Sequence, residues 1–319
     1  MNLIICTTPF QVLLAERIVE KYPNEEFYGI LFSHTRNNKY DYYYNILKKF
    51  CKKYSFFYVN PVGNKLIYIK MLLFLRMKSF FLIKINKVFI ASIDGINIHL
   101  LLSSLDMKKI EIYTYDDGVA NIVKDSFLYK RIHRKIDILG HLVGNKYSMD
   151  LLKENSICHY SVYRQSNIID NVIYLDLIDP KSLGLNKKNN VEANISILLG
   201  QPIYELANDF IDKEYMNKYI CNSVIKKFNI DYYFPHPRET YRIDKVDYIN
   251  TELIFEDFFS KNYNPDINYT LYTFFSGSVL PFIKISNVKI VSVKPINCPN
   301  EFLSSYNKFL DMGIDIVEI

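Results

Sequence analysis

Apolar and polar positions along the first half of the chain predict strands that alternate with helices. Short apolar runs at residues 3–7 and 27–33 flank an amphipathic stretch at residues 9–22, which opens on the helix-start signal Thr-Thr-Pro. Two more apolar runs, at residues 88–92 and 110–115, follow at helix-length intervals. This βαβ order predicts a parallel sheet with helices on both of its faces.

A second series of the same kind follows a polar segment at residues 179–194, which contains Pro and Gly and predicts the main linker. Residues 213–228 have a helical pattern. Further strands are predicted at residues 195–199, 230–234, 270–275 and 288–293. The whole pattern predicts an α/β protein of two Rossmann-like domains that face a central cleft, with boundaries at residues 1–180 and 190–319.

The composition is that of an ordinary globular protein. The chain has 319 residues, of which 49% are hydrophobic and 23% charged, and its formal net charge of +5 is too modest to indicate a nucleic-acid partner. Its five cysteines form no C-x-x-C pair, so neither a disulfide framework nor a zinc site is expected. The first residues carry no signal-peptide pattern, and we expect a cytoplasmic protein.

Basic residues concentrate in an apolar segment at residues 62–85. Five of them alternate there with Leu, Ile, Met and Phe: Lys65, Lys70, Arg76, Lys78 and Lys84. The charges interrupt the segment too often for it to span a bilayer, which takes about 20 mostly apolar residues. Two roles fit it equally: a helix that lies on an anionic membrane surface, or a core or homodimer-packing helix with a basic rim.

The tetrapeptide Phe234-Pro235-His236-Pro237, followed by Arg238, is the sharpest chemical signal in the chain. A histidine between two prolines, just past a predicted strand, has little backbone freedom, so its imidazole can be directed at one spot. With an arginine two residues later, this turn suits an anion. A rigid structural turn explains the same residues equally well.

Polar clusters follow several of the other predicted strands, where parallel sheets bind their ligands. These clusters are Thr7-Thr8, Asp116-Asp117-Gly118, Gly200-Gln201-Pro202 and Ser276-Gly277-Ser278. The last one precedes a helix predicted to begin near Val279, so it suits a phosphate, although an ordinary helix cap has the same residues. The chain has no Walker motif, no G-x-G-x-x-G and no Asp-x-Asp, which favours a phosphate site of His, Arg and hydroxyl groups without a metal.

Taken in order, several short stretches resemble the bacterial lipooligosaccharide and capsule sialyltransferases, glycosyltransferase family 52. The stretches are residues 2–6, 15–18, 36–44, 115–118, 197–202, 235–241, 256–257 and 272–277. The resemblance covers nearly the whole chain. It implies a GT-B fold and inverting transfer, without a metal or other cofactor, of sialic acid from CMP-sialic acid to a terminal galactose, with α-2,3 linkage expected.

The resemblance further implies the setting of the reaction. The acceptor would be a galactose-terminated glycan or lipid-linked oligosaccharide of a capsular polysaccharide or lipooligosaccharide, and the missing anchor and the composition favour a capsule precursor. Many relatives carry an N-terminal membrane anchor, whereas this chain starts at its first strand. Peripheral contact with the inner face of the cell membrane would then depend on the basic segment.

The residues that match the family motifs also gain roles from the resemblance. His236 would meet the donor phosphate and stabilise or protonate the departing CMP. Ser276 and Gly277 would hold the same phosphate, and Glu256 would bind the ribose hydroxyls with Phe255 beside it. The other residues expected around the donor are Gly200, Gln201, Pro202, Pro235, Pro237, Arg238 and Thr273.

The general base that the resemblance implies is an acid shortly after the Gly-x-Pro turn. An insertion leaves the choice among Asp209, Asp212 and Glu214, and we take Asp212 because it starts the next helix as the family acid does. A plain helix N-cap is the alternative role for Asp212. Asp116 is the rival base, since related sialyltransferase families use an acid of the Asp-Asp-Gly motif.

Two other hypotheses stay open from the sequence. One is transfer of a different sugar, such as glucose, on the same scaffold. The other is a catalytically silent protein that binds a glycan or a membrane.

Overall fold

The computed structural model describes residues 1–34, 37–59, 65–82, 84–124, 126–130, 135–164, 167–177, 193–204, 212–236, 239, 241–298 and 300–319. The chain divides into two compact units, Met1–Leu177 and Ile178–Ile319, each built on one parallel sheet. The predicted α/β fold with two Rossmann-like sheets is therefore confirmed. Most of the predicted linker lies outside the described residues, and its last two residues begin the first strand of the second sheet.

The N-terminal unit contains a seven-stranded sheet in the order β3-β2-β1-β4-β5-β6-β7, in which every neighbouring pair is parallel. The strands are β1 (Asn2–Cys6), β2 (Phe27–Ser33), β3 (Lys53–Tyr58), β4 (Lys87–Ile90), β5 (Glu111–Tyr115), β6 (Ser156–Ser161) and β7 (Val172–Tyr174). The chain builds outward from β1 in one direction and then continues from β4 in the other. The switch point, where such sheets bind ligands, therefore lies between β1 and β4.

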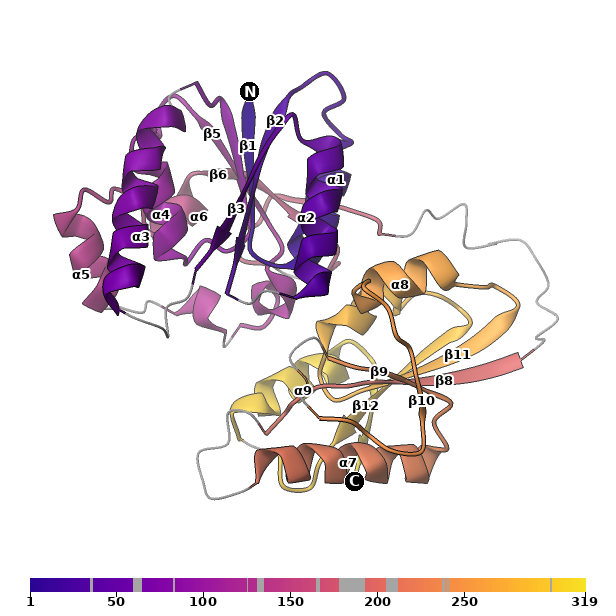
Figure 1. Ribbon diagram of the computed structural model, residues 1–319. Helices are drawn as coiled ribbons and strands as arrows, with labels where there is room; N and C mark the ends of the chain where they lie inside the picture. Colours follow the sequence, from indigo (N-terminus) through magenta and orange to yellow (C-terminus); the bar gives the residue numbers. More distant parts are fainter. Residues whose placement is uncertain are drawn as a thin grey trace. The chain divides into compact units, whose positions relative to one another are not determined.

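Helices cover both faces of this sheet, with α1 and α2 on one side and α3 and α4 on the other (Figure 1). The helices are α1 (Pro9–Val19), α2 (Asn38–Phe50), α3 (Lys65–Lys78), α4 (Ile96–Leu102), α5 (Lys135–Leu142) and α6 (Met149–Glu154), with 3₁₀ turns η1 (Ser79–Leu82), η2 (Gly118–Asn121) and η3 (Phe127–Tyr129). Leu3, Ile5 and Ile90 of the strands form a buried core with Leu75 of α3 and Leu101 of α4. Burial on both faces explains why these strands are almost continuously apolar.

The C-terminal unit contains a six-stranded parallel sheet in the order β10-β9-β8-β11-β12-β13. The strands are β8 (Ala193–Leu199), β9 (Tyr232–Phe234), β10 (Asp247–Tyr248), β11 (Ile267–Thr273), β12 (Val288–Lys294) and β13 (Asp315–Glu318). The helices are α7 (Lys213–Phe228), α8 (Phe255–Asn262) and α9 (Leu303–Asp311), with 3₁₀ turns η5 (Gly277–Phe282) and η6 (Asn300–Phe302). Here the switch point lies between β8 and β11.

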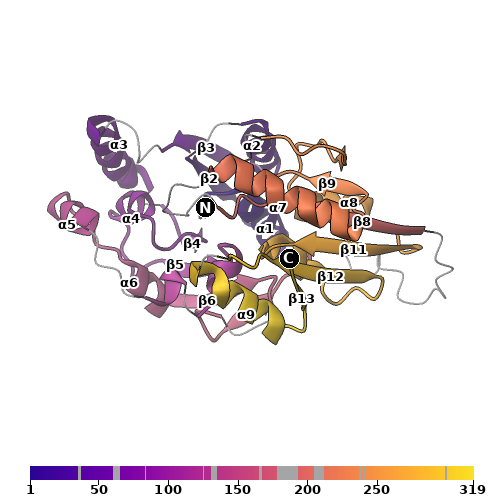
Figure 2. The ribbon, with the colours of Figure 1, turned by 90° about the horizontal axis from the view of Figure 1, so that it is seen from below.

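Strand β9 shows how the two faces of this sheet are covered. Tyr233 joins the buried cluster that contains Ile220 and Val224 of α7, whereas the next residue, Phe234, packs edge-on against Phe255 of α8 with ring centroids 5.2 Å apart. Alternate side chains of a strand point to opposite faces, so α7 and α8 cover opposite sides. Figure 2 shows α7 in front of this sheet, and Figure 1 shows α8 on its other side.

The strand predicted at residues 270–275 is β11, which begins and ends earlier. Two further predicted elements differ from the structure for identifiable reasons. The strand expected from residue 230 starts at Tyr232, because the Asp231 carboxylate accepts hydrogen bonds from the Ser196 backbone N–H and hydroxyl, both at 2.7 Å, in place of ladder bonds. The helix expected near Val279 is the short 3₁₀ turn η5, which contains Pro281. Among the helices described, none is long and apolar enough to cross a membrane.

Candidate active site

The switch point of the N-terminal sheet carries a polar cluster from three adjacent strand ends. Thr7 follows β1, Ser92 follows β4 and Asp117 follows β5, while Gln11 reaches the same place from the first turns of α1. The Thr8 hydroxyl caps α1 by accepting from the Gln11 backbone N–H at 3.2 Å, which fixes the start of this helix. Gln11 itself is fully buried.

Hydrogen bonds of the Gln11 side-chain amide connect the residues of this cluster. Its Oε1 accepts from the Thr7 backbone N–H at 2.6 Å and from the Thr7 hydroxyl at 3.1 Å. Its Nε2 donates to Ser92 Oγ at 3.0 Å and to Asp117 Oδ1 at 2.5 Å. Thr7 Oγ1 also lies 2.7 Å from Ser92 Oγ. All polar atoms of the amide have partners, so the amide orients one oxygen of the Asp117 carboxylate.

The half-buried Asp117 is chemically unusual. Burial raises the pKa of its carboxyl group from the ordinary 3.8 to about 6. The charges of Asp94 and Asp116 raise this pKa further, whereas hydrogen bonds from Ser92 and Gln11 act to lower it. A carboxylate whose pKa is close to neutrality is a better proton acceptor than an ordinary aspartate.

Asp116, the predicted rival base, has a different environment from its neighbour. It is fully buried, and its Oδ1 accepts from His159 Nε2 at 3.0 Å while its Oδ2 accepts from the Val162 backbone N–H at 2.7 Å. The other ring nitrogen of His159 lies 2.8 Å from Thr114 Oγ1. These contacts tie β5 to β6. The catalytic role of Asp116 stays a prediction, and Asp117 is the more accessible of the two carboxylates.

The C-terminal sheet brings three predicted site segments to one edge. His236 follows β9, Gly200 and Gln201 follow β8, and Ser276 follows β11, and these three strands are neighbours in the order β9-β8-β11. Adjacent strands lie about 4.8 Å apart, so the three turns share the carboxyl edge at the switch point. His236 and Ser276 are both half-buried, so part of each residue is accessible to solvent.

A carboxylate that the sequence did not single out as a site residue holds the histidine turn. Glu239 Oε2 accepts from the His236 backbone N–H at 3.0 Å, and the Glu239 N–H donates to the His236 carbonyl at 3.0 Å. Its Oε1 accepts from the Tyr233 hydroxyl at 2.8 Å. Burial raises the pKa of Glu239 above its ordinary value. The only sequence signal for this role is an acid three residues after the histidine.

Tyr233 and Glu239 come so close to residue 200 that only a glycine fits there. A Cβ atom at Gly200 would lie 2.3 Å from the Tyr233 hydroxyl oxygen and 2.4 Å from Glu239 Oε2, distances too short for any side chain. The Gly200 N–H donates to the Phe234 carbonyl at 2.8 Å. The glycine therefore allows the ends of β8 and β9 to approach each other closely.

Side-chain hydrogen bonds also shape the turn after β11. Gln201 Oε1 accepts from the Phe275 backbone N–H at 3.2 Å, which links the two strands across the switch point. The buried Thr273 hydroxyl accepts from the Ser276 N–H at 3.0 Å, and Ser276 Oγ accepts from the Ser278 N–H at 3.4 Å at the start of η5. The residues after β8 and β11 that are expected to bind the sugar donor are therefore linked by hydrogen bonds at one edge of the sheet.

The remaining predicted site residues differ in burial, and some lie outside the described residues. Phe255 and Glu256 begin α8 and are buried, and Phe255 belongs to an aromatic cluster with Phe234 and Phe282. Asp212 is exposed and caps α7 by accepting from the Tyr215 N–H at 3.0 Å. Glu214 pairs with Lys218 in the same helix. Pro202 is buried and Pro235 half-buried, whereas Pro237, Arg238 and Asp209 lie outside the described residues.

In the part of the chain that the structure describes, no group of three His, Cys, Asp or Glu side chains could hold a metal ion, and metal independence stays a prediction.

Comparison with known proteins decides the family. The family model described as glycosyltransferase family 52 matches residues 24–297. The chain belongs to glycosyltransferase family 52. The predicted family is therefore confirmed.

Curated relatives resemble this family 52 chain over its full length. It is 35% identical to a CMP-N-acetylneuraminate:beta-galactoside alpha-2,3-sialyltransferase of Pasteurella multocida, over 100% of this chain and 99% of that protein. It is 32% identical to N-acetyllactosaminide alpha-2,3-sialyltransferases of Neisseria meningitidis and Haemophilus influenzae, over 99% of this chain and 85% and 99% of those proteins. A solved structure of Phytolacca americana UGT2, complexed with UDP-2fluoro-glucose and pterostilbene, has a TM-score of 0.46 and 9% identity over 97% of this chain and 82% of that one.

Proposed function

We propose that this family 52 protein is an α-2,3-sialyltransferase that moves sialic acid from CMP-sialic acid to the galactose of a β-galactoside. The observation that carries the proposal is 35% identity to an enzyme of that name over 100% of this chain. Two ordered polar edges, one with a histidine and one with a carboxylate whose pKa is about 6, supply groups that such a transfer needs. The acceptor we propose is a bacterial surface glycan, either a capsular polysaccharide precursor or lipooligosaccharide.

We assign the donor phosphate to the carboxyl edge of the C-terminal sheet. In the reaction the bond between sialyl C2 and the phosphate oxygen breaks, and CMP leaves with the electron pair. His236 would stabilise or protonate that oxygen, and the Ser276 hydroxyl with the Gly277 N–H would hold the phosphate. Such groups act most strongly in the transition state, where charge on the leaving group grows. Glu239 is the positioning residue for His236, because it binds the backbone of the turn on both sides.

We assign proton removal from the acceptor to Asp117 at the carboxyl edge of the N-terminal sheet. The galactose 3-hydroxyl oxygen forms the new bond to C2 on the face opposite the leaving phosphate, which inverts the configuration, and its proton passes to the Asp117 carboxylate. Three features favour Asp117 over Asp116: partial exposure, a carboxylate oriented by Gln11, and a pKa of about 6. Asp212, the exposed cap of α7, is the alternative base.

The proposal is tested by incubating the purified protein with CMP-sialic acid and lactose. We expect CMP release that depends on lactose and a product whose NMR spectrum shows sialic acid α-linked to galactose O3. Failure to release CMP with any β-galactoside would support a silent glycan-binding protein instead. A larger rise in melting temperature with UDP than with CMP would favour transfer of another sugar, since a ligand that binds only the native state stabilises it.

A further inference from the structure

His34 is a titratable side chain at the carboxyl edge of the N-terminal sheet that the proposed reaction does not use. It is the first residue after β2 and is exposed. Strand β2 neighbours β1 in the order β2-β1-β4-β5, so His34 lies at the same edge as Thr7 and Asp117. Because parallel sheets bind their ligands at this edge, an exposed imidazole here is in a position to meet the acceptor.

One hydrogen bond fixes the orientation of the His34 ring. Its Nδ1 lies 2.8 Å from the Val59 carbonyl oxygen, which can only accept, so Nδ1 carries the proton. In the neutral ring the lone pair is then on Nε2. Val59 is itself buried, and its N–H donates to the Ser33 carbonyl at 2.8 Å, which extends the pairing of β2 with β3. The ring is therefore attached to a rigid part of the sheet, and Nε2 is the nitrogen that can accept a hydrogen bond from a ligand.

Tyr40 ties the segment after His34 to the end of β1. The Asn37 side chain caps α2 by accepting from the Tyr40 N–H at 3.1 Å, and the Tyr40 hydroxyl donates to the Thr7 carbonyl at 3.4 Å. Tyr40 and Thr7 are both half-buried, so part of each residue is accessible. Polar groups therefore follow one another along the edge, from His34 after β2 through Thr7 after β1 to Asp117 after β5.

The separation between His34 and Asp117 suits a disaccharide. Strands β2 and β5 are three places apart in the sheet, and neighbouring strands lie about 4.8 Å apart, so their ends are separated by roughly 14 Å. One pyranose ring is much shorter than this distance. A second ring, linked to the galactose through its O1, lengthens the acceptor along the edge, so that each of the two side chains can reach one ring.

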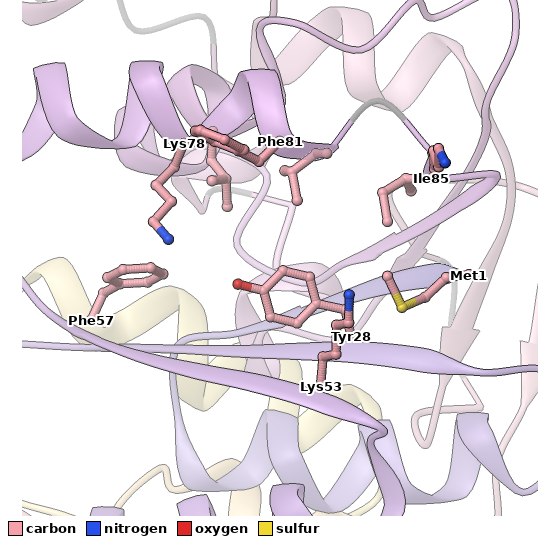
Figure 3. A pocket seen from close by; sticks show the side chains of 10 residues that line it. Met1, Tyr28, Lys53, Phe57, Lys78, Phe81 and Ile85 are labelled. Carbon is pink, nitrogen blue, oxygen red and sulfur yellow. The ribbon is translucent and has the colours of Figure 1, made fainter.

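The pocket of about 210 Å³ in Figure 3 lies at the opposite edge of this sheet. Its lining includes Met1, which precedes β1, Lys53, the first residue of β3, and Ile85, which precedes β4. It is therefore one strand length from the carboxyl edge, or about 16 Å for the five residues of β1. A galactose whose 3-hydroxyl meets Asp117 cannot occupy this pocket, so the acceptor belongs at the edge that carries His34.

We propose that His34 is a specificity-determining residue that contacts the second sugar of the acceptor. Its Nε2 accepts a hydrogen bond from a hydroxyl group of the sugar to which the galactose is linked, while the galactose 3-hydroxyl meets Asp117. The inference rests on the proposed function and deepens it, because it makes the recognised acceptor a disaccharide unit rather than a single galactose. His34 takes no part in the chemical step, so it should change the binding of the acceptor and leave kcat unchanged.

Two acceptors test this contact: lactose, which has the second ring, and methyl β-galactoside, which lacks it. His34→Ala should raise KM for lactose roughly fivefold with little change in kcat, since one hydrogen bond to the acceptor is lost. Its kinetics with methyl β-galactoside and its hydrolysis of CMP-sialic acid should stay at the wild-type values. The matched control His141→Ala, at an exposed histidine of α5, should leave the kinetics with both acceptors unchanged.

Two amide variants separate contact with the sugar from support of the turn after β2. The amide of asparagine reaches the position of Nδ1 and can keep the bond to the Val59 carbonyl, whereas the amide of glutamine reaches the position of Nε2 and can accept from the sugar. His34→Gln should therefore keep most of the preference for lactose over methyl β-galactoside, and His34→Asn should lose it. The opposite order, with a lower melting temperature in His34→Gln, would overturn the contact and make His34 a support of the turn.

Saturation-transfer NMR of lactose gives a readout that needs no turnover. Wild-type protein should contact protons of both rings, and His34→Asn should lose the contact with the glucose ring while it keeps the contact with galactose. Wild-type protein that contacts the galactose ring alone would overturn the inference, and so would an equal loss with both acceptors in His34→Ala. If neither acceptor receives sialic acid but His34→Asn still loses the glucose contact, the proposed function is wrong and the contact of His34 with the second sugar is supported.

Discussion

The two carboxyl edges of the protein are built in opposite ways. At the N-terminal sheet, side chains bond to side chains: the Gln11 amide joins Thr7, Ser92 and Asp117. At the C-terminal sheet, side chains bond mainly to backbone: Glu239 holds the turn at His236, and Gly200 provides the space for this clamp.

The difference indicates a division of labour between the edges. A network of side chains can tune and orient one carboxylate, which suits the removal of a proton. Turns whose backbone is held by Glu239 and Thr273 place His236 and Ser276 at neighbouring strand ends, which suits an anion whose charge grows during the reaction. Variants that break one edge should therefore produce a different defect from variants that break the other.

His236→Ala should have the largest effect. We expect kcat/KM for transfer to fall about 10³- to 10⁴-fold, because both charge stabilisation and protonation of the departing CMP are lost. Steady-state CMP release measures this loss. The exposed His141→Ala is the matched control and should be active, and near-normal turnover in His236→Ala would remove His236 from the mechanism.

Asp116→Ala should mainly lower the free energy of unfolding. Leaving a buried donor without its acceptor typically costs about 1–3 kcal/mol, and both the His159 ring and the Val162 N–H would lose their acceptor. Urea unfolding measures the change. The exposed cap variant Asp212→Ala should cost only about 1 kcal/mol. An Asp116→Ala protein of wild-type stability would show that the buried pair contributes nothing.

Asp117→Asn should lower transfer about 10²-fold and change its pH dependence. Because the pKa of Asp117 is raised to about 6, the group is protonated below that pH and cannot accept a proton, so wild-type kcat/KM should fall as the pH drops through about 6. The asparagine variant should lack this limb. If Asp212→Asn removes the limb and Asp117→Asn retains it, the base is Asp212.

Glu239→Gln should have the smallest effect, about tenfold on kcat. The amide keeps one acceptor oxygen for the His236 N–H but weakens a bond that a charged group strengthens. Since Glu239 acts through the turn, the melting temperature should change little, while Glu239→Ala should lose more activity than Glu239→Gln. Equal activity of the two variants would show that the carboxylate does not position His236.

Sequence patterns predicted most of the architecture because the signals were local. The strand at residues 27–33 and the helix at residues 213–228 have the predicted bounds, since apolar runs and a capping Asp212 define them within a few residues. The strand expected from residue 230 was placed too early, because Asp231 satisfies Ser196 from another strand. Such long-range hydrogen bonds leave no local pattern.

The site was predictable as a set of strand ends but not in its detail. Asp116 and Asp117 are adjacent carboxylates, and the one that is buried is held by His159 and the Val162 N–H, 43 and 46 residues away in the chain. Gln11 was missed because it bonds to Ser92 and Asp117, which lie 81 and 106 residues away in the chain. Glu239 was missed because the only local signal for its bonds to His236 is an acid three residues after the histidine. Chemistry that depends on burial therefore requires the structure.

The most direct test of the division between the edges is the ratio of sialyl transfer to hydrolysis of CMP-sialic acid, measured with and without lactose. We expect His236→Ala to lower both rates by a similar factor, because both need CMP to leave. Asp117→Asn should lower transfer about 10²-fold and leave hydrolysis within a few-fold of the wild type, since water replaces the acceptor. Equal loss of both rates in Asp117→Asn would contradict the account.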